Sequence, residues 1–139
     1  MKLSKNFTLA EFTSSATATR LGIDNSHASI KQILNLAHLC HQVLQPLRNQ
    51  FGTITISSGL RCQELNRAVG GSTFSQHLYG EAADISLPSK DLGREYFTFL
   101  QTLPEWDQLI WEQANNACWI HVSIRRLGTN RKQVLWITR

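Results

Sequence analysis

Two segments late in the sequence alternate apolar and polar side chains, and only a short polar link separates them. The first runs from Asp107 to Glu112, the second from Trp119 to Ile124, and the link covers Gln113 to Ala117. A period of two is typical of strands with one buried face, and a short link joins neighbouring strands in antiparallel order. We therefore predict a β-hairpin here, which requires the rest of the chain to supply a cover for one face of a sheet.

Patterns elsewhere in the sequence supply both further strands and the covering helices. Thr8 and Glu11 have the spacing of a capping box and predict a short helix within residues 6–13. The spacing of apolar residues predicts helices over about 29–50, with a kink at Pro46, and over 63–69 and 90–102. Segments rich in β-branched residues, or alternating apolar and polar ones, predict strands at 53–57, 82–87 and 133–137. We expect residues 14–25 to be a loop. The predicted fold class is α+β, a small and largely antiparallel sheet with helices packed on one face.

Composition limits the classes to which the chain can belong. Hydrophobic residues make up 42% of the 139 and charged residues 17%, which suits one folded domain over 1–139, with an N-terminal arm over about 1–25. No apolar run has the length of a membrane span, and the first residues lack the apolar core of a signal peptide, so we expect synthesis in the cytoplasm without membrane insertion.

The three cysteines suit reduced thiols. The net charge of +4 comes without a basic and aromatic platform, so we expect no nucleic-acid partner and a monomer.

Three side chains carry the pattern of a metal site. His77 and Asp84 flank Gly80 in the segment 75–84, and His121 lies within the second hairpin strand. Two imidazoles and one carboxylate are a common ligand set of catalytic zinc, which keeps a fourth position open. Each residue alone also has an ordinary explanation, as a loop histidine, a strand-edge carboxylate and a hydrogen-bonded core histidine. Their combination favours a zinc site on the sheet.

The text around these residues resembles a known family. Residues 75–84 read Ser-x-His-x-x-Gly-x-Ala-x-Asp, residues 119–123 read Trp-x-His-x-Ser, and residues 58–61 read Ser-Gly-x-Arg. This is similar to the zinc D-alanyl-D-alanine carboxypeptidase family of peptidoglycan peptidases, whose fold is shared with the hedgehog signalling domain. The resemblance covers about residues 6–125. The N-terminal text resembles the compact, often phage-associated branch of the family.

The resemblance implies roles for single residues. His77, Asp84 and His121 match the ligands of one Zn²⁺ ion per chain. Arg61 matches an arginine that holds a carboxylate or carbonyl of the peptide substrate, as its fork of donors allows. Ser75 is assigned with Arg61 to the substrate side, where it shapes the loop that carries His77.

The general base is the part of the pattern from which this sequence departs. Some branches of the family have a carboxylate three residues before the last histidine, and here that position is Cys118. A symmetric hairpin pairs Glu112 with Trp119 and Ile110 with His121, which puts Glu112 on the face of His121, so Glu112 is the predicted base. Asp107 and Glu81 are the alternative carboxylates. A structural zinc site built from Cys62, Cys118 and His121 is a competing but weaker interpretation.

The resemblance, together with the predicted zinc site, implies a zinc-dependent metallopeptidase that hydrolyses peptide bonds in peptidoglycan stem peptides. Both a D-Ala-D-Ala carboxypeptidase and an endopeptidase of the endolysin type fit the pattern. The alternatives are a non-catalytic zinc-binding recognition module of the same fold and a phage tail component. We expect the protein to act on the bacterial cell wall, after phage-type release or as part of a virion.

Overall fold

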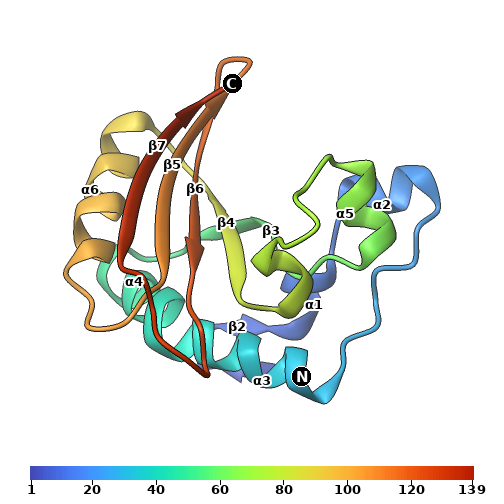
Figure 1. The fold of residues 1–139 in the computed structure, drawn as a ribbon. Coiled ribbons are helices and arrows are strands. Elements are labelled where there is room, and N and C mark those ends of the chain that lie inside the picture. Colours follow the sequence, from blue (N-terminus) through green and yellow to red (C-terminus); the bar gives the residue numbers. More distant parts are fainter.

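The computed structural model describes all residues from 1 to 139, and its centre is a twisted sheet (Figure 1). The sheet has five strands in the order β3-β4-β6-β5-β7. Their bounds are β3 (Thr55–Ser58), β4 (Ala82–Ser86), β5 (Gln108–Ala114), β6 (Ala117–Ser123) and β7 (Gln133–Thr138). The predicted α+β class is confirmed. The sheet is mixed, however, because β7 runs parallel to β5 while the other three pairs are antiparallel.

The predicted hairpin forms with the predicted register. Strands β5 and β6 pair Glu112 with Trp119 and Ile110 with His121. Leu109, Trp111, Ile120 and Val122 then share the opposite face, where all four are buried. Asn115 and Asn116 form the short turn, and both adopt a positive φ. Asparagine tolerates this conformation better than most residues do.

Helices cover the face of the sheet that carries these apolar side chains. The long helical segment consists of α3 (Ile30–Leu39), a π-helical stretch η1 (Cys40–Leu44) and α4 (Gln45–Phe51), and α6 spans Lys90–Gln101. Figure 1 shows α4 and α6 on the same side of the sheet. Buried side chains of these helices and of the sheet form a single core cluster that includes Leu36, Leu44, Leu100 and Leu109.

The predicted kink at Pro46 takes the form of a widened turn. Gln45 donates its backbone N–H to the carbonyl of Cys40, five residues earlier, so the chain makes π-type bonds just before the proline. Proline has no N–H and its ring displaces the carbonyl of the preceding turn. A widened turn accommodates this without ending the helical segment.

The N-terminal arm holds more structure than the sequence predicted. The capping box forms, with Glu11 accepting the backbone N–H of Thr8 at 3.0 Å at the start of α1 (Leu9–Thr13). A two-stranded ribbon of β1 (Lys2–Ser4) and β2 (Phe7–Thr8) precedes it. The expected loop over 14–25 is wrong in part, because Ala16–Leu21 form helix α2, capped by Ser15 and ended by Gly22 at φ 69°. The two threonines of this segment have low helix propensity, so capping and packing decide that it is helical.

Two short helices lie on the other side of the sheet. These are α5 (Gln63–Ala68) and the 3₁₀ helix η2 (Gln76–Tyr79), which contact each other beside β3 and β4 (Figure 1). They leave much of that face uncovered, and a groove forms there. No helix combines the length and apolar character needed to span a bilayer.

Candidate metal centre

The strand pairing brings the two sheet residues of the predicted site together. Asp84 of β4 lies directly opposite His121 of β6, so both side chains point from the same face. His77 comes from η2, which leads through Gly80 into β4. Gly80 has a φ of 74°, and the chain turns there because glycine adopts this conformation without steric cost.

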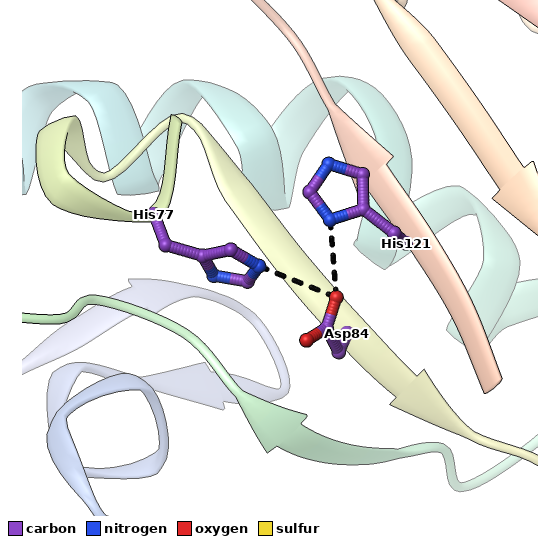
Figure 2. A group of neighbouring side chains, drawn as sticks. All are labelled: His77, Asp84 and His121. Carbon is purple, nitrogen blue, oxygen red and sulfur yellow. Dashed lines mark hydrogen bonds and ion pairs between the residues drawn. The ribbon is translucent and has the colours of Figure 1, made fainter. Parts of the chain in front are cut away.

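The three side chains converge on one point (Figure 2). One ligand atom from each of His77, Asp84 and His121 lies within 4.8 Å of the others. His77 Nε2 is 3.3 Å and His121 Nδ1 is 3.1 Å from the same oxygen, Oδ1 of Asp84. Two imidazole nitrogens and a carboxylate oxygen at this spacing fit a zinc ion with a fourth position open.

Contacts behind His77 fix which of its nitrogens faces the cluster. Nδ1 lies 2.7 Å from the carbonyl oxygen of Gly59, and because a carbonyl only accepts, Nδ1 carries the proton. Nε2 is therefore the nitrogen that faces Asp84 and that would bind a metal ion. A side chain at Gly59 would place its Cβ 2.7 Å from Cα of Phe12, so only glycine lets this turn approach helix α1. The Ser75 hydroxyl accepts the backbone N–H of His77 at 3.2 Å.

The charge of Asp84 is maintained despite burial. Burial by itself raises the pKa of this carboxyl, but the nearby imidazoles of His77 and His121 outweigh that effect and bring the pKa well below its usual value. The Arg61 guanidinium lies 3.5 Å from the second oxygen, Oδ2. An ionised carboxylate between two histidines provides the negative charge that a divalent cation needs.

Arg61 is held in place beside the cluster rather than free in solvent. Its Nε donates to Ser58 Oγ at 3.2 Å and its Nη1 donates to Asn66 Oδ1 at 3.2 Å. Burial lowers the pKa of Arg61, while the carboxylates of Asp84 and Glu112 act in the opposite direction. Three of its five N–H groups have partners, which leaves donors for a ligand in the groove.

The groove runs along the uncovered face of the sheet and encloses about 780 Å³. The three clustered residues, Arg61, Ser75 and Glu112 all line it. Glu112 is 8% exposed and shares the face of His121, because its pair with Trp119 lies two residue pairs farther along the hairpin than the pair of Ile110 with His121. Trp119 donates its indole N–H to Glu112 Oε2 at 2.7 Å, and Arg139 Nη2 lies 3.0 Å from Oε1. The structure thus places the three predicted ligands in one groove with Arg61, Ser75 and Glu112.

A comparison with protein families agrees with this geometry. The sequence model described as Peptidase M15 matches residues 5–123. The chain belongs to the Peptidase M15 family. The resemblance to zinc D-Ala-D-Ala carboxypeptidases is therefore confirmed, and membership points to a zinc metallopeptidase. A search of curated proteins finds no match.

In this M15 family member Asp107, one of the two alternative carboxylates considered as a base, has a different use. Asp107 is fully buried and accepts from Arg131 Nη2 at 2.7 Å and from the Arg131 backbone N–H at 2.7 Å. Burial raises the pKa of Asp107, but the hydrogen bonds from Arg131 outweigh it and lower the pKa below the usual value. Asp107 thus serves as an anchor for the chain that leads into β7.

The competing cysteine site does not form. Cys118 and His121 are three residues apart on β6, so alternation directs them to opposite faces of the sheet. Cys62 instead caps α5, where its Sγ accepts the Leu65 N–H at 3.4 Å. All three cysteines are free, as expected for reduced thiols.

Two contacts of the groove escaped the sequence reasoning. Asn66 orients Arg61 through a hydrogen bond, and no sequence pattern around Asn66 predicts this contact. The contact between Arg139 and Glu112 could have been found from the alternation of residues along β7. Once β7 is known to pair with β5, this alternation puts residues 137 and 139 on the same face as Glu112. The parallel pairing itself was not visible in the sequence.

Proposed function

We propose that this M15 family member is a zinc-dependent peptidase that hydrolyses peptide bonds in peptidoglycan stem peptides. The observation that carries the proposal is the His77, Asp84 and His121 cluster, which lies in an open groove with a buried carboxylate on the same sheet face. The ligand set suits zinc, and the groove suits an extended peptide.

In this proposal His77 Nε2, an Asp84 oxygen and His121 Nδ1 hold the metal. When bound, zinc polarises a carbonyl group and lowers the pKa of water towards neutrality. The Gly59 carbonyl keeps the His77 ring oriented by accepting its Nδ1 proton, as partners behind ligating histidines commonly do. The charged form of Asp84 offsets part of the cation's charge.

Glu112 is the proposed general base. It accepts the proton of the attacking water and can return it to the leaving amine. The Trp119 N–H holds Oε2, so the carboxylate keeps one orientation and directs its remaining lone pairs into the groove. Burial of Glu112 among these partners excludes most bulk water from the proton transfer.

Arg61 and Ser75 form the proposed substrate side. Arg61 offers its unpartnered N–H groups to a carbonyl or carboxylate of the peptide, and Ser58 and Asn66 keep the guanidinium in position. Ser75 acts through the backbone of His77, which it holds at the start of η2.

The extent of the groove bears on which bond is cut. A second depression of about 470 Å³ shares Asp84 and Trp119 with the groove, and Ser57 and Ser86 also line it. A peptide in the groove therefore has room to continue past Asp84. This favours an internal bond of the stem peptide over its terminal D-Ala-D-Ala bond.

The test combines metal analysis with digestion of purified peptidoglycan, with and without a chelator. The wild type should hold about one zinc and release new amino termini that the chelator abolishes. His77→Ala should lose both metal and activity. Glu112→Gln should keep its zinc and lose turnover by about a hundredfold or more, because only the proton acceptor is removed.

Glu95→Gln is the matched control, since Glu95 is an exposed carboxylate on α6 away from the groove. Full activity of Glu112→Gln would contradict the assignment of the base. Bound zinc without any cleavage by the wild type would instead support the non-catalytic recognition module. Release of D-alanine alone would replace the endopeptidase by a carboxypeptidase.

A further inference from the structure

Three arginines line the groove, and two of them are fixed by several contacts. Arg61 donates to Ser58 and Asn66 and faces Asp84. Arg131 donates hydrogen bonds to the buried Asp107 carboxylate from Nε, from Nη2 and from its backbone N–H. Each of these two guanidinium groups is therefore held in one position by the protein's own side chains.

Arg139 differs from these two. Its guanidinium contacts a single side chain, Glu112, through Nη2 at 3.0 Å, and the side chain is 60% exposed. The backbone N–H of Arg139 donates to the Gln113 carbonyl at 2.8 Å, which extends the pairing of β7 with β5 and fixes where the side chain starts. An anchored backbone thus carries a guanidinium with most of its donors available to the groove.

We infer that Arg139 determines specificity by binding a carboxylate of the peptide substrate, which replaces Glu112 as its partner. The inference rests on the proposed function and adds the kind of group that the substrate must carry. The Arg139 side chain is 60% exposed, so a carboxylate that enters the groove can reach its guanidinium and take the place of Glu112. Arginine suits this task because its planar fork matches a carboxylate in two-point contact.

The exchange also changes the surroundings of Glu112. In the free protein both carboxylate oxygens have partners, Oε2 with Trp119 and Oε1 with Arg139. When a substrate carboxylate takes Arg139, Oε1 becomes free while Trp119 still orients the group. Binding of an acidic peptide therefore uncovers the proposed proton acceptor.

The contact belongs to a part of the chain outside the family match. The match ends at residue 123, whereas β7 spans Gln133–Thr138 and Arg139 follows it. The metal cluster and Arg61 lie within the matched segment. Strand β7 therefore adds a specificity element to a site that the matched segment provides.

The test uses the zinc-loaded protein and three synthetic peptides. The parent is L-Ala-γ-D-Glu-L-Lys-D-Ala-D-Ala, the second carries an amide in place of the D-Glu α-carboxylate, and the third carries a C-terminal amide. The wild type should lose about tenfold in kcat/KM on one of the two amidated peptides. Arg139→Gln should show that loss on the parent and no further loss on the same amidated peptide.

Arg94→Gln is the control, because Arg94 is an exposed arginine on α6 that pairs only with Asp91. Equal losses for Arg139→Gln on all three peptides would overturn the inference, since Arg139 would then act on Glu112 alone. Unchanged kinetics would overturn it as well.

Calorimetric binding of the same peptides separates the inference from the proposed function. If the wild type cleaves none of them, the peptidase proposal fails, and the inference is decided by whether Arg139→Gln removes the preference for the free carboxylate in binding. Equal affinity of both proteins for the parent and amidated peptides would refute it.

Discussion

At the scale of single residues, the indole of Trp119 has a function that its aromatic character alone does not indicate. Its N–H donates to Glu112 Oε2 at 2.7 Å across the hairpin. Because a base must present a lone pair in a defined direction, this hydrogen bond links the register of two strands to the orientation of one carboxylate.

Trp119→Phe should therefore lower kcat by about tenfold while bound zinc and the circular dichroism spectrum stay unchanged. Phenylalanine keeps an aromatic ring in the groove and removes only the donor. Steady-state kinetics on peptidoglycan fragments checks this.

Trp111→Phe is the matched control. Trp111 donates its N–H to Gln113 at 3.0 Å, and its ring packs against Phe97 on the helix-covered face. This variant should keep its kcat. A similar fall in both variants would mean that loss of packing, not loss of the hydrogen bond, slows the reaction.

At the scale of elements, Asp107 connects the start of β5 with the chain that enters β7. Its side chain is fully buried, and Arg131 and Arg125 lie 2.7 and 3.5 Å from Oδ2. The Gln133 N–H donates to the Asp107 carbonyl at 2.9 Å. One residue thus fixes the position at which the parallel strand begins.

Asp107→Asn should lower the free energy of unfolding at neutral pH by about 1.5–3 kcal/mol, because the hydrogen bonds from Arg131 lose their charged acceptor. The folded protein holds the pKa of Asp107 below its usual value of 3.8. The stabilisation is therefore complete above that value and is lost as the pH falls through the lower folded-state pKa. Urea unfolding at several pH values checks both statements.

Asp91→Asn is the control, since the Asp91 side chain is 94% exposed in its pair with Arg94. We expect a change within about 0.5 kcal/mol at any pH. A stability difference between the wild type and Asp107→Asn that stays constant into strong acid would contradict the role of the charge.

At the scale of the whole molecule, the cluster ties together segments that are distant in the sequence. His77 belongs to η2, Asp84 to β4 and His121 to β6. Unfolding separates these three side chains, so an ion that binds all of them would stabilise the folded state by mass action.

Free zinc at about one hundred times its dissociation constant should raise the free energy of unfolding by about 2.7 kcal/mol, and a chelator should reverse this. His121→Ala should remove the effect. His27→Ala should retain it, because His27 is an exposed histidine that pairs with Asp24 outside the cluster. A zinc effect of equal size in His121→Ala would show that the ion binds elsewhere.

Local chemistry explains which elements the sequence predicted well. The capping box at Thr8 and Glu11, the alternation of the hairpin and the helical spacing over 90–102 each act over a few residues. Helix α2 and the π-type bonds before Pro46 were not predicted in this form, because packing of the neighbouring elements outweighs weak or conflicting local preferences.

The sequence by itself determined the chemistry of the candidate site. It specified two histidines, an aspartate, an arginine and a glutamate, and the short hairpin link determined that Glu112 and His121 share a face. Only the tertiary structure decided the parallel addition of β7 and with it the contact between Arg139 and Glu112. The physical reason is range, since pairing of neighbouring strands follows from local periodicity, whereas the place of a strand that returns after a long connection depends on buried contacts such as those of Asp107.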